Sequence, residues 1–119
     1  EHFLPPGEDL VPHCPGDFLE EPPLVCGIRN SRLRELALAV HTLWPSLCRR
    51  THPHIDPSRQ SLLARRHPLV VAGGRFREGY YWDSFWIVKG LVASSMLETA
   101  KNVVRNFLDD VQLFGFVPN

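Results

Sequence analysis

One stretch of the chain reads Gly73-Gly74-Arg75-Phe76-Arg77-Glu78-Gly79-Tyr80-Tyr81-Trp82-Asp83. Its eleven residues combine three glycines, two arginines, two carboxylates and four aromatic rings. A surface loop rarely exposes so many rings unless a ligand covers them. A pyranose sugar suits this mixture, because its C–H faces stack on rings and its hydroxyl groups need convergent donors and acceptors. The stretch therefore indicates a sugar-binding surface.

The same stretch resembles the first signature of the trehalases, glycoside hydrolases that cut α,α-trehalose into two glucoses. The shared pattern is Gly-Gly-Arg-Phe-x-Glu-x-Tyr-x-Trp-Asp, and residues 73–83 match it throughout. The family signature begins with proline where this chain has Ala72, and it ends with tyrosine where this chain has Phe85. Neither difference removes a charge or a planar polar group. The glycine pair also lacks the spacing of phosphate-binding loops, so phosphate binding is not indicated.

The composition is that of one electrically neutral domain. Of the 119 residues, 44% are apolar, and 13 acidic residues balance 13 basic ones. This balance does not indicate a nucleic acid or an anionic membrane as a partner. No run approaches the ~18 consecutive apolar residues of a membrane span, and no secretory signal opens the sequence. Because the chain begins with Glu1 rather than Met, and stops abruptly, we expect it to be a piece of a longer protein.

The spacing of cysteine and histidine predicts no metal site. The three cysteines are Cys14, Cys26 and Cys48. They lack the close pairs of zinc ribbons and redox motifs, and three free or buried thiols are expected, although Cys14 and Cys26 could pair in an oxidising compartment. His52, His54 and Asp56 alternate as ligands on a strand could, but the prolines around them favour a loop and no fourth ligand is nearby. The resemblance implies no metal and no organic cofactor.

Prolines separate an extended segment from a run of helices. Residues 1–29 contain six prolines, which predicts an extended Pro-rich segment that runs over a surface. Residues 30–119 show the 3–4 spacing of apolar side chains that is typical of helices at about 31–44, 84–93 and 97–114. The last of these has the clearest apolar stripe.

Local signals place the ends of these helices. Asn30 or Ser31 would cap the first helix, and Asp83 or Ser84 would cap the second. Gly115 is expected to end the third helix. The first helix would be ended or kinked by the proline at position 45, and the histidine at position 41 would be partly buried in it rather than catalytic.

The predicted fold class is all-α, because only short runs near 69–71 and 116–117 suggest strands. Trehalases form an (α/α)6 barrel of alternating inner and outer helices, so the resemblance implies that residues 30–119 form the N-terminal helices of an incomplete barrel. Twelve helices of ~11–12 residues with loops of ~4–6 need upwards of about 200 residues. The resemblance also implies that one face of these helices is apolar and has no partner within the chain.

Glycoside hydrolysis requires two carboxyl groups, ~6.5–9.5 Å apart in inverting enzymes and ~5–5.5 Å apart in retaining ones. Glu78 and Asp83 are the local pair, but they would lie roughly 16 Å apart on a strand and ~140° apart around a helix. We therefore do not expect them to act as acid and base. The catalytic aspartate and glutamate of the family lie downstream of this signature, so the chain is expected to contain no catalytic residue.

Residue-by-residue matching with the family makes Arg75, Trp82 and Asp83 substrate contacts. Residues 115–119 resemble the next family block, in which the asparagine that corresponds to Asn119 also contacts the sugar; their phenylalanine stands where a histidine is often found. Arg75 can donate a planar fork of hydrogen bonds, and Asp83 can accept from two adjacent hydroxyls. Trp82 offers an indole face or an N–H donor, and Asn119 offers both a donor and an acceptor.

Three other residues of the signature have a structural interpretation. Phe76 and Tyr81 are expected to fill the core. Glu78 is equally consistent with a ligand contact and with an internal ion pair at a helix entrance.

The resemblance implies an inverting trehalase whose substrate is trehalose, with this chain as part of the sugar-binding wall. It also implies a location outside the cell or at its surface, in some relatives through a lipid anchor that this sequence does not contain. The alternative is a non-catalytic helical module, truncated or degenerate, that binds a sugar or a protein partner. A third interpretation is a related glycosidase of the same fold, which would release glucose from maltose or sucrose instead.

Overall fold

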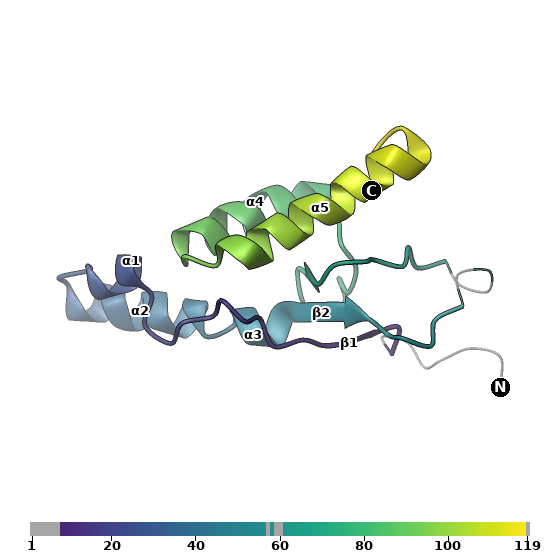
Figure 1. Cartoon of the computed structure of the whole chain (residues 1–119). Helices are drawn as coiled ribbons and strands as arrows, with labels where there is room; N and C mark the ends of the chain where they lie inside the picture. Colours follow the sequence, from purple (N-terminus) through teal and green to yellow (C-terminus); the bar gives the residue numbers. More distant parts are fainter. Residues whose placement is uncertain (1–7, 57, 59–60, 119) are drawn as a thin grey trace.

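The computed structural model describes residues 8–56, 58 and 61–118 of a chain whose extents are 52 × 33 × 22 Å. Its elements, in chain order, are β1 (Leu10–Pro12), α1 (Pro23–Cys26), α2 (Ser31–His41), α3 (Trp44–Leu47), β2 (Cys48–Thr51), β3 (Leu69–Val70), α4 (Tyr81–Ala93) and α5 (Leu97–Phe114). The pair α4 and α5 forms one layer, and the strands with α2 and α3 form the other (Figure 1).

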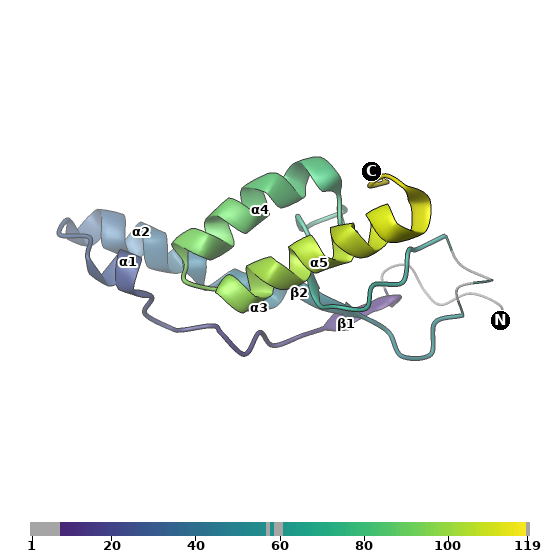
Figure 2. The same ribbon diagram turned by 45° about the horizontal axis from the view of Figure 1, so that its top comes forward.

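The helices α4 and α5 run side by side in opposite directions (Figure 2). The turn between them has the hydrogen bonds of a Schellman motif, with the N–H of Ser95 donating to Val92 O and the N–H of Met96 donating to Leu91 O at 2.8 Å. Ser95 adopts the left-handed conformation at φ 61°, and Met96 is fully buried. Gly115, at φ 79°, ends α5 as the sequence predicted.

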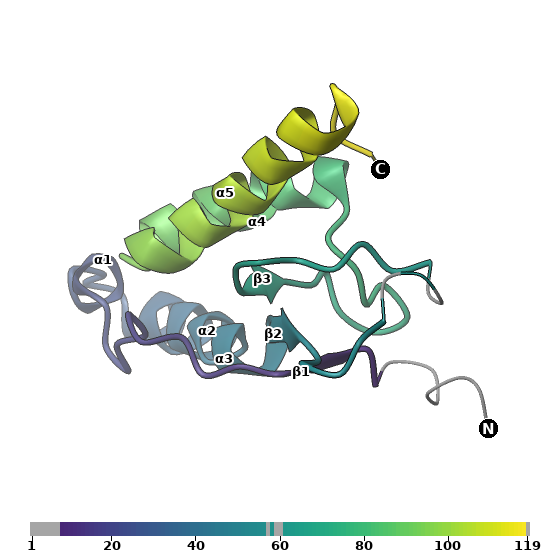
Figure 3. The ribbon, with the colours of Figure 1, turned by 45° about the vertical axis from the view of Figure 1, so that its right-hand side comes forward.

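A three-stranded antiparallel sheet in the order β1-β2-β3 accompanies the helices, so the all-α prediction is only partly confirmed (Figure 3). Leu10 lies opposite Thr51 in the first pair, and Cys48 lies opposite Val70 in the second. The strands have only three, four and two residues, too few to show an alternating pattern in the sequence. Pro12 fits on β1 because an edge strand does not need every N–H group. The fold is therefore helix-rich with a small sheet.

Two apolar clusters meet at β3. Val70 belongs to the main core, which joins the sheet to the helical hairpin and consists of Cys48, Val70, Leu91, Met96, Ala100 and Val103. Its neighbours Leu69 and Val71 pack with Leu10 in a second cluster. Successive side chains of a strand point to opposite faces, so this short strand contributes to both clusters.

The edge of α5 that faces the core is partly polar. Its buried residues are Thr99, Ala100, Val103, Asn106 and Asp110. Most of the apolar stripe predicted from the sequence faces outward, with Leu97, Leu108, Val111 and Phe114 among the exposed side chains. The stripe of α2 is also exposed at Leu33, Leu36 and Val40. Apolar helix faces without a partner among the described residues are what the resemblance implied.

The first predicted helix is confirmed at its start and is shorter than predicted at its end. The side chain of Asn30 caps α2 by accepting the N–H of Leu33 at 3.1 Å. The helix ends at His41 because the ring of Pro45 would clash with the carbonyl group four residues earlier. His41 is buried as expected, and its Nε2 lies 2.6 Å from Leu19 O.

The second predicted helix begins three residues earlier than its capping signals suggested. Neither Asp83 nor Ser84 is the N-cap; the cap position of α4 is Tyr80, which has extended backbone angles and makes no side-chain cap. The hydroxyl of Ser84 instead donates to Tyr80 O at 2.6 Å. Asp83 lies in the first turn, where a negative charge is favourable beside the helix N-terminus.

The described part of the Pro-rich segment is attached to the fold at several points. Leu10 is buried in the sheet cluster, and the ring of Phe18 stacks on His41 with centroids 4.7 Å apart. The carboxylate of Asp17 accepts the backbone N–H of Thr99 at 2.9 Å and also the Thr99 hydroxyl. Asp17 therefore caps the first turn of α5 from a distant part of the chain.

All three cysteines are free thiols, with Cys14 and Cys26 exposed. Burial raises the pKa of the Cys48 thiol to about 12. Among the described residues, no helix has the length and apolar character needed to cross a bilayer.

A substitution at Gly90 tests how α4 packs against α3. A Cβ atom at this position would lie 2.8 Å from Cζ2 and 3.0 Å from Cη2 of the Trp44 ring. Helix propensity alone would make Gly90→Ala stabilising by about 1 kcal/mol. We expect it instead to destabilise the chain by about 1–3 kcal/mol, because the indole must move. Urea unfolding followed by circular dichroism measures the difference.

The control is Gly16→Ala, since a Cβ there meets no atom within 4 Å. Trp44→Phe removes the clashing atoms, so Gly90→Ala should be neutral or stabilising in that background. Destabilisation of the same size in both backgrounds would contradict this account.

The cap that Asp17 provides predicts a dependence of stability on pH. Burial of the carboxyl acts to raise its pKa, but the hydrogen bonds from Thr99, together with those from the backbone of Asp17 and Glu98, outweigh this and hold the pKa below its ordinary value. Because the pKa is lower in the folded state, the carboxylate stabilises the fold at pH values above its unfolded-state pKa of about 4. This contribution is lost as the pH falls through the folded-state pKa. Asp17→Asn should therefore cost about 1 kcal/mol at pH 7 and less near pH 3. A cost that does not depend on pH in urea titrations would refute this assignment.

Candidate functional site

The signature stretch begins in a tight turn. Gly73 and Gly74 have φ values of 107° and 60°, a region that L side chains rarely adopt. The N–H of Phe76 donates to Gly73 O at 3.0 Å, and the N–H of Gly73 donates to Phe76 O at 3.1 Å. The turn leads directly from the buried β3 strand to Arg75, so the backbone of this arginine starts from a rigid element.

Arg75 lines a cavity of about 420 Å³ at the sheet end of the molecule. The lining residues are Asp9, Leu10, Leu62, Arg75, Arg77, Glu78 and Tyr80. Two acidic and two basic residues therefore line one space, and their formal charges cancel. Such a cavity suits a neutral ligand with many donors and acceptors better than it suits a phosphate or a metal cation.

The guanidinium group of Arg75 lies over the ring of Phe76, 5.0 Å from its centroid. Neither Asp9 nor Glu78 forms an ion pair with Arg75 within the described part of the chain. Glu78 therefore does not make the internal ion pair with Arg75 that was one interpretation of the sequence. The donors of Arg75 and these acceptors remain available to a ligand.

A second cavity of about 400 Å³ continues the first. The two share Leu10, Leu62, Glu78 and Tyr80, and the second extends to Phe114, Phe116 and Pro118. The predicted contact Asn119 lies outside the described residues. Its neighbour Pro118 lines this cavity, so the last described residue and residues 78–80 of the signature stretch border the same space.

Trp82 lies on a different surface. It is 71% exposed and lines an apolar groove of about 620 Å³ between α4 and α5. The groove is formed by Tyr81, Trp82, Ser84, Phe85, Trp86, Val88, Lys89, Val104, Phe107, Leu108, Val111 and Val117. Asp83 is half-buried in the first turn of α4. Arg75, Glu78 and Tyr80 thus line one cavity, whereas Trp82 lines the separate apolar groove between α4 and α5.

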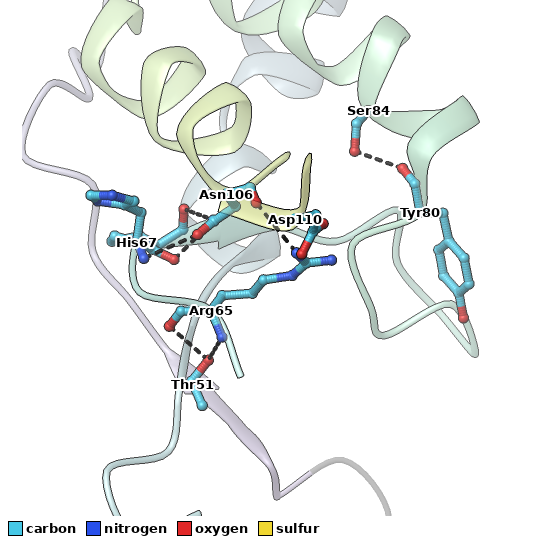
Figure 4. Close-up of polar contacts among 8 residues, drawn as sticks. Thr51, Arg65, His67, Tyr80, Ser84, Asn106 and Asp110 are labelled. Atoms are coloured by element: carbon cyan, nitrogen blue, oxygen red, sulfur yellow. Dashed lines mark hydrogen bonds and ion pairs between the residues drawn. The ribbon is translucent and has the colours of Figure 1, made fainter. Parts of the chain in front are cut away.

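A network of polar contacts holds the loop that forms one wall of these cavities (Figure 4). Thr51 Oγ1 accepts the N–H of Arg65 at 2.9 Å, and Arg65 Nη1 forms a buried ion pair with Asp110. Asn106 accepts the N–H of His67 and donates to His67 O at 3.0 Å. These contacts attach residues 61–68 to the polar edge of α5.

No group of three or more metal-ligating side chains is found among the residues that the structure describes. The ring of His52 instead accepts the N–H of His54 through Nδ1 at 3.2 Å.

Comparison with known proteins identifies the family. A family model described as Trehalase matches residues 1–119, which is the whole chain. The chain belongs to the trehalase family. Trehalases of Homo sapiens, Bombyx mori and Arabidopsis thaliana are 43%, 42% and 41% identical to it, and the alignments cover 98–100% of the chain. They cover only 20–21% of each relative, so the chain spans about a fifth of the length of these trehalases.

The sequence did not reveal every residue that lines the cavity of this trehalase-family chain. Asp9 was missed because it lies in the Pro-rich segment, far from the signature, and only the pairing of β1 with β2 brings it near. Tyr80 is part of the trehalase signature, but no role was predicted for it. Phe76 and Tyr81 were wrongly expected in the core, since both are exposed. Their rings pack edge-on against Tyr80 and Phe107 and still leave surface for a ligand.

The buried ion pair of this trehalase-family chain yields a stability prediction. The side chains of Arg65 and Asp110 are only 8% and 4% exposed. Asp110→Ala should destabilise the chain by about 3–5 kcal/mol, because it leaves a buried positive charge without its partner. Replacing both residues, as Arg65→Met with Asp110→Leu, should recover most of that loss. Urea unfolding checks both variants.

The exposed pair of Lys101 and Glu98 supplies the control. Lys101→Met should leave stability unchanged within error, because solvent screens this pair. The prediction would be wrong if Asp110→Ala and Lys101→Met had similar effects.

Proposed function

We propose that this chain forms part of the sugar-binding wall of an inverting trehalase, which hydrolyses α,α-trehalose to two glucose molecules. The observation that carries the proposal is the charge-balanced cavity around Arg75, which adjoins exposed aromatic rings. A disaccharide is neutral, polar at its edges and apolar on its faces, so it matches both surfaces. Family membership supports the proposal, and the names of the relatives state the same activity for those proteins.

Within the proposed site, Arg75 donates a fork of hydrogen bonds to adjacent hydroxyls, and Glu78 accepts from others. Trp82, Asp83 and Asn119 are proposed as further sugar contacts, with Trp82 offering its indole face. Such contacts accelerate the reaction only where they tighten as the sugar ring flattens toward an oxocarbenium ion. The chain's own part in the reaction is therefore to bind and orient the sugar.

We propose that the acid and the base of the reaction come from outside these 119 residues. An inverting enzyme needs two carboxyl groups separated by about 6.5–9.5 Å, with water between one of them and the sugar. Glu78 lines the cavity, whereas Asp83 is not among its lining residues, which supports our view that these two do not form the pair. A location outside the cell is proposed on the resemblance alone.

Glucose release from trehalose tests the proposal directly. We expect none from this chain and clear release from a polypeptide extended to the length of the curated trehalases. In the extended polypeptide, Arg75→Ala should lower kcat/KM by about 10- to 100-fold, the effect expected for the loss of a charged hydrogen-bond donor. Arg66→Ala is the matched control, because Arg66 is exposed and lines neither of these cavities.

Three outcomes would contradict the proposal in different ways. Release by this chain that vanishes with Arg75→Ala would mean that an acid–base pair lies within it. Release from maltose or sucrose, without release from trehalose, would indicate a related glycosidase. If the extended polypeptide released glucose from none of the three sugars, the non-catalytic helical module would be favoured.

A further inference from the structure

Asp9 stands at the start of β1, where the sheet fixes its backbone. Its carbonyl oxygen accepts the N–H of His52 at 2.8 Å. The next residue, Leu10, is buried in the second apolar cluster and pairs with Thr51. The position of Asp9 therefore depends on main-chain hydrogen bonding and on the burial of its neighbour.

Asp9 lines the same cavity as Arg75, Glu78 and Tyr80. These residues come from the signature stretch, whereas Asp9 comes from the Pro-rich segment, so two distant parts of the chain border one space. No hydrogen bond or ion pair joins the Asp9 carboxylate to another described residue. Asp9 is half-buried, and a carboxylate that binds no described residue is available as an acceptor.

The chemistry of the lining restricts what Asp9 can bind. A phosphate would meet two carboxylates, and a metal cation would meet two guanidinium groups, so each would be repelled by part of the wall. A sugar hydroxyl is both a donor and an acceptor and can use both kinds of group. Because a carboxylate accepts from two adjacent hydroxyls, Asp9 complements Arg75, which can only donate.

We infer that Asp9 is a sugar-binding residue, and that the N-terminal strand thereby forms one wall of the site. Its carboxylate accepts hydrogen bonds from hydroxyls of the glucose unit that Arg75 holds. This inference rests on the proposed function, since it assigns a further contact to the same site. It gives the Pro-rich segment a part in recognising the substrate, in addition to its part in the fold.

Amide chemical shifts of the 119-residue chain, followed by NMR during titration with trehalose, test the inference. We expect the amides of Asp9 and Leu10 to shift together with those of residues 75–80. Asp9→Asn should weaken binding by about tenfold, because it replaces a charged acceptor by a neutral one. Glu8→Gln should leave binding unchanged, since it removes the same charge from an exposed residue that does not line the cavity.

The outcomes separate this inference from the proposed function. Shifts confined to residues 75–80, with no effect of Asp9→Asn, would overturn the inference and leave the proposed function standing. Shifts that persist with Arg75→Ala would overturn both. No shifts in the unsubstituted chain would overturn the inference for this chain, while glucose release by the extended polypeptide would still decide the proposed function. If Asp9→Asn fails to fold, its own spectrum reports the failure, and the shifts of the unsubstituted chain still distinguish these outcomes.

Discussion

Three buried polar side chains on α5, Thr99, Asn106 and Asp110, determine how the molecule is assembled. A polar group removed from water must find a hydrogen-bond partner, or the fold loses free energy. The three find their partners in two other parts of the chain: Asp17 of the Pro-rich segment binds Thr99, and the loop of residues 61–68 supplies the backbone around His67 for Asn106 and Arg65 for Asp110. These bonds select the face that α5 turns toward the sheet, and its apolar stripe consequently lies on the other side.

The same constraint shapes the candidate site. Residues 61–68 are attached to α5, and Leu62 from this loop lines the cavity opposite the signature turn. The sheet fixes the remaining sides, because Asp9 adjoins β1 and β3 leads into the turn that presents Arg75. Side chains on such a frame start from fixed backbone positions, which favours precise recognition of hydroxyl groups. The aromatic face of α4 is a separate surface that shares no lining residue with this polar cavity.

Much of the helical framework could be predicted from local signals. Asn30 caps α2, and Gly115 ends α5, because capping depends on the few residues around a helix end. Strand β3 lies in the short apolar run near 69–71 that suggested a strand. The other strands could not be predicted, since β2 reads Cys-Arg-Arg-Thr and owes its strand conformation to partners distant in sequence. The orientation of α5 was missed for a related reason: periodicity locates an apolar stripe, but only tertiary contacts reveal that Asn106 and Asp110 are buried.

The candidate site was predictable to the extent that it lies within one motif. Arg75 and its turn could be predicted from the signature. Asp9 could not, because the strand pairing that brings it to the cavity has no local signal in the sequence. The sequence also did not reveal that Trp82 and Arg75 line different surfaces. A helix begins at Tyr81, so side chains that follow it in the motif point in other directions than those before it.

The bond between Asp17 and Thr99 spans 82 positions, and this distance has a consequence for biosynthesis. At about 5–20 residues per second, a ribosome needs about 4–16 s to travel from one partner to the other. Cys48 and Val70 are synthesised within that interval, but Ala100 and Val103, which complete their core, are not. The apolar side chains of the N-terminal half therefore stay without part of their core until α5 has been synthesised.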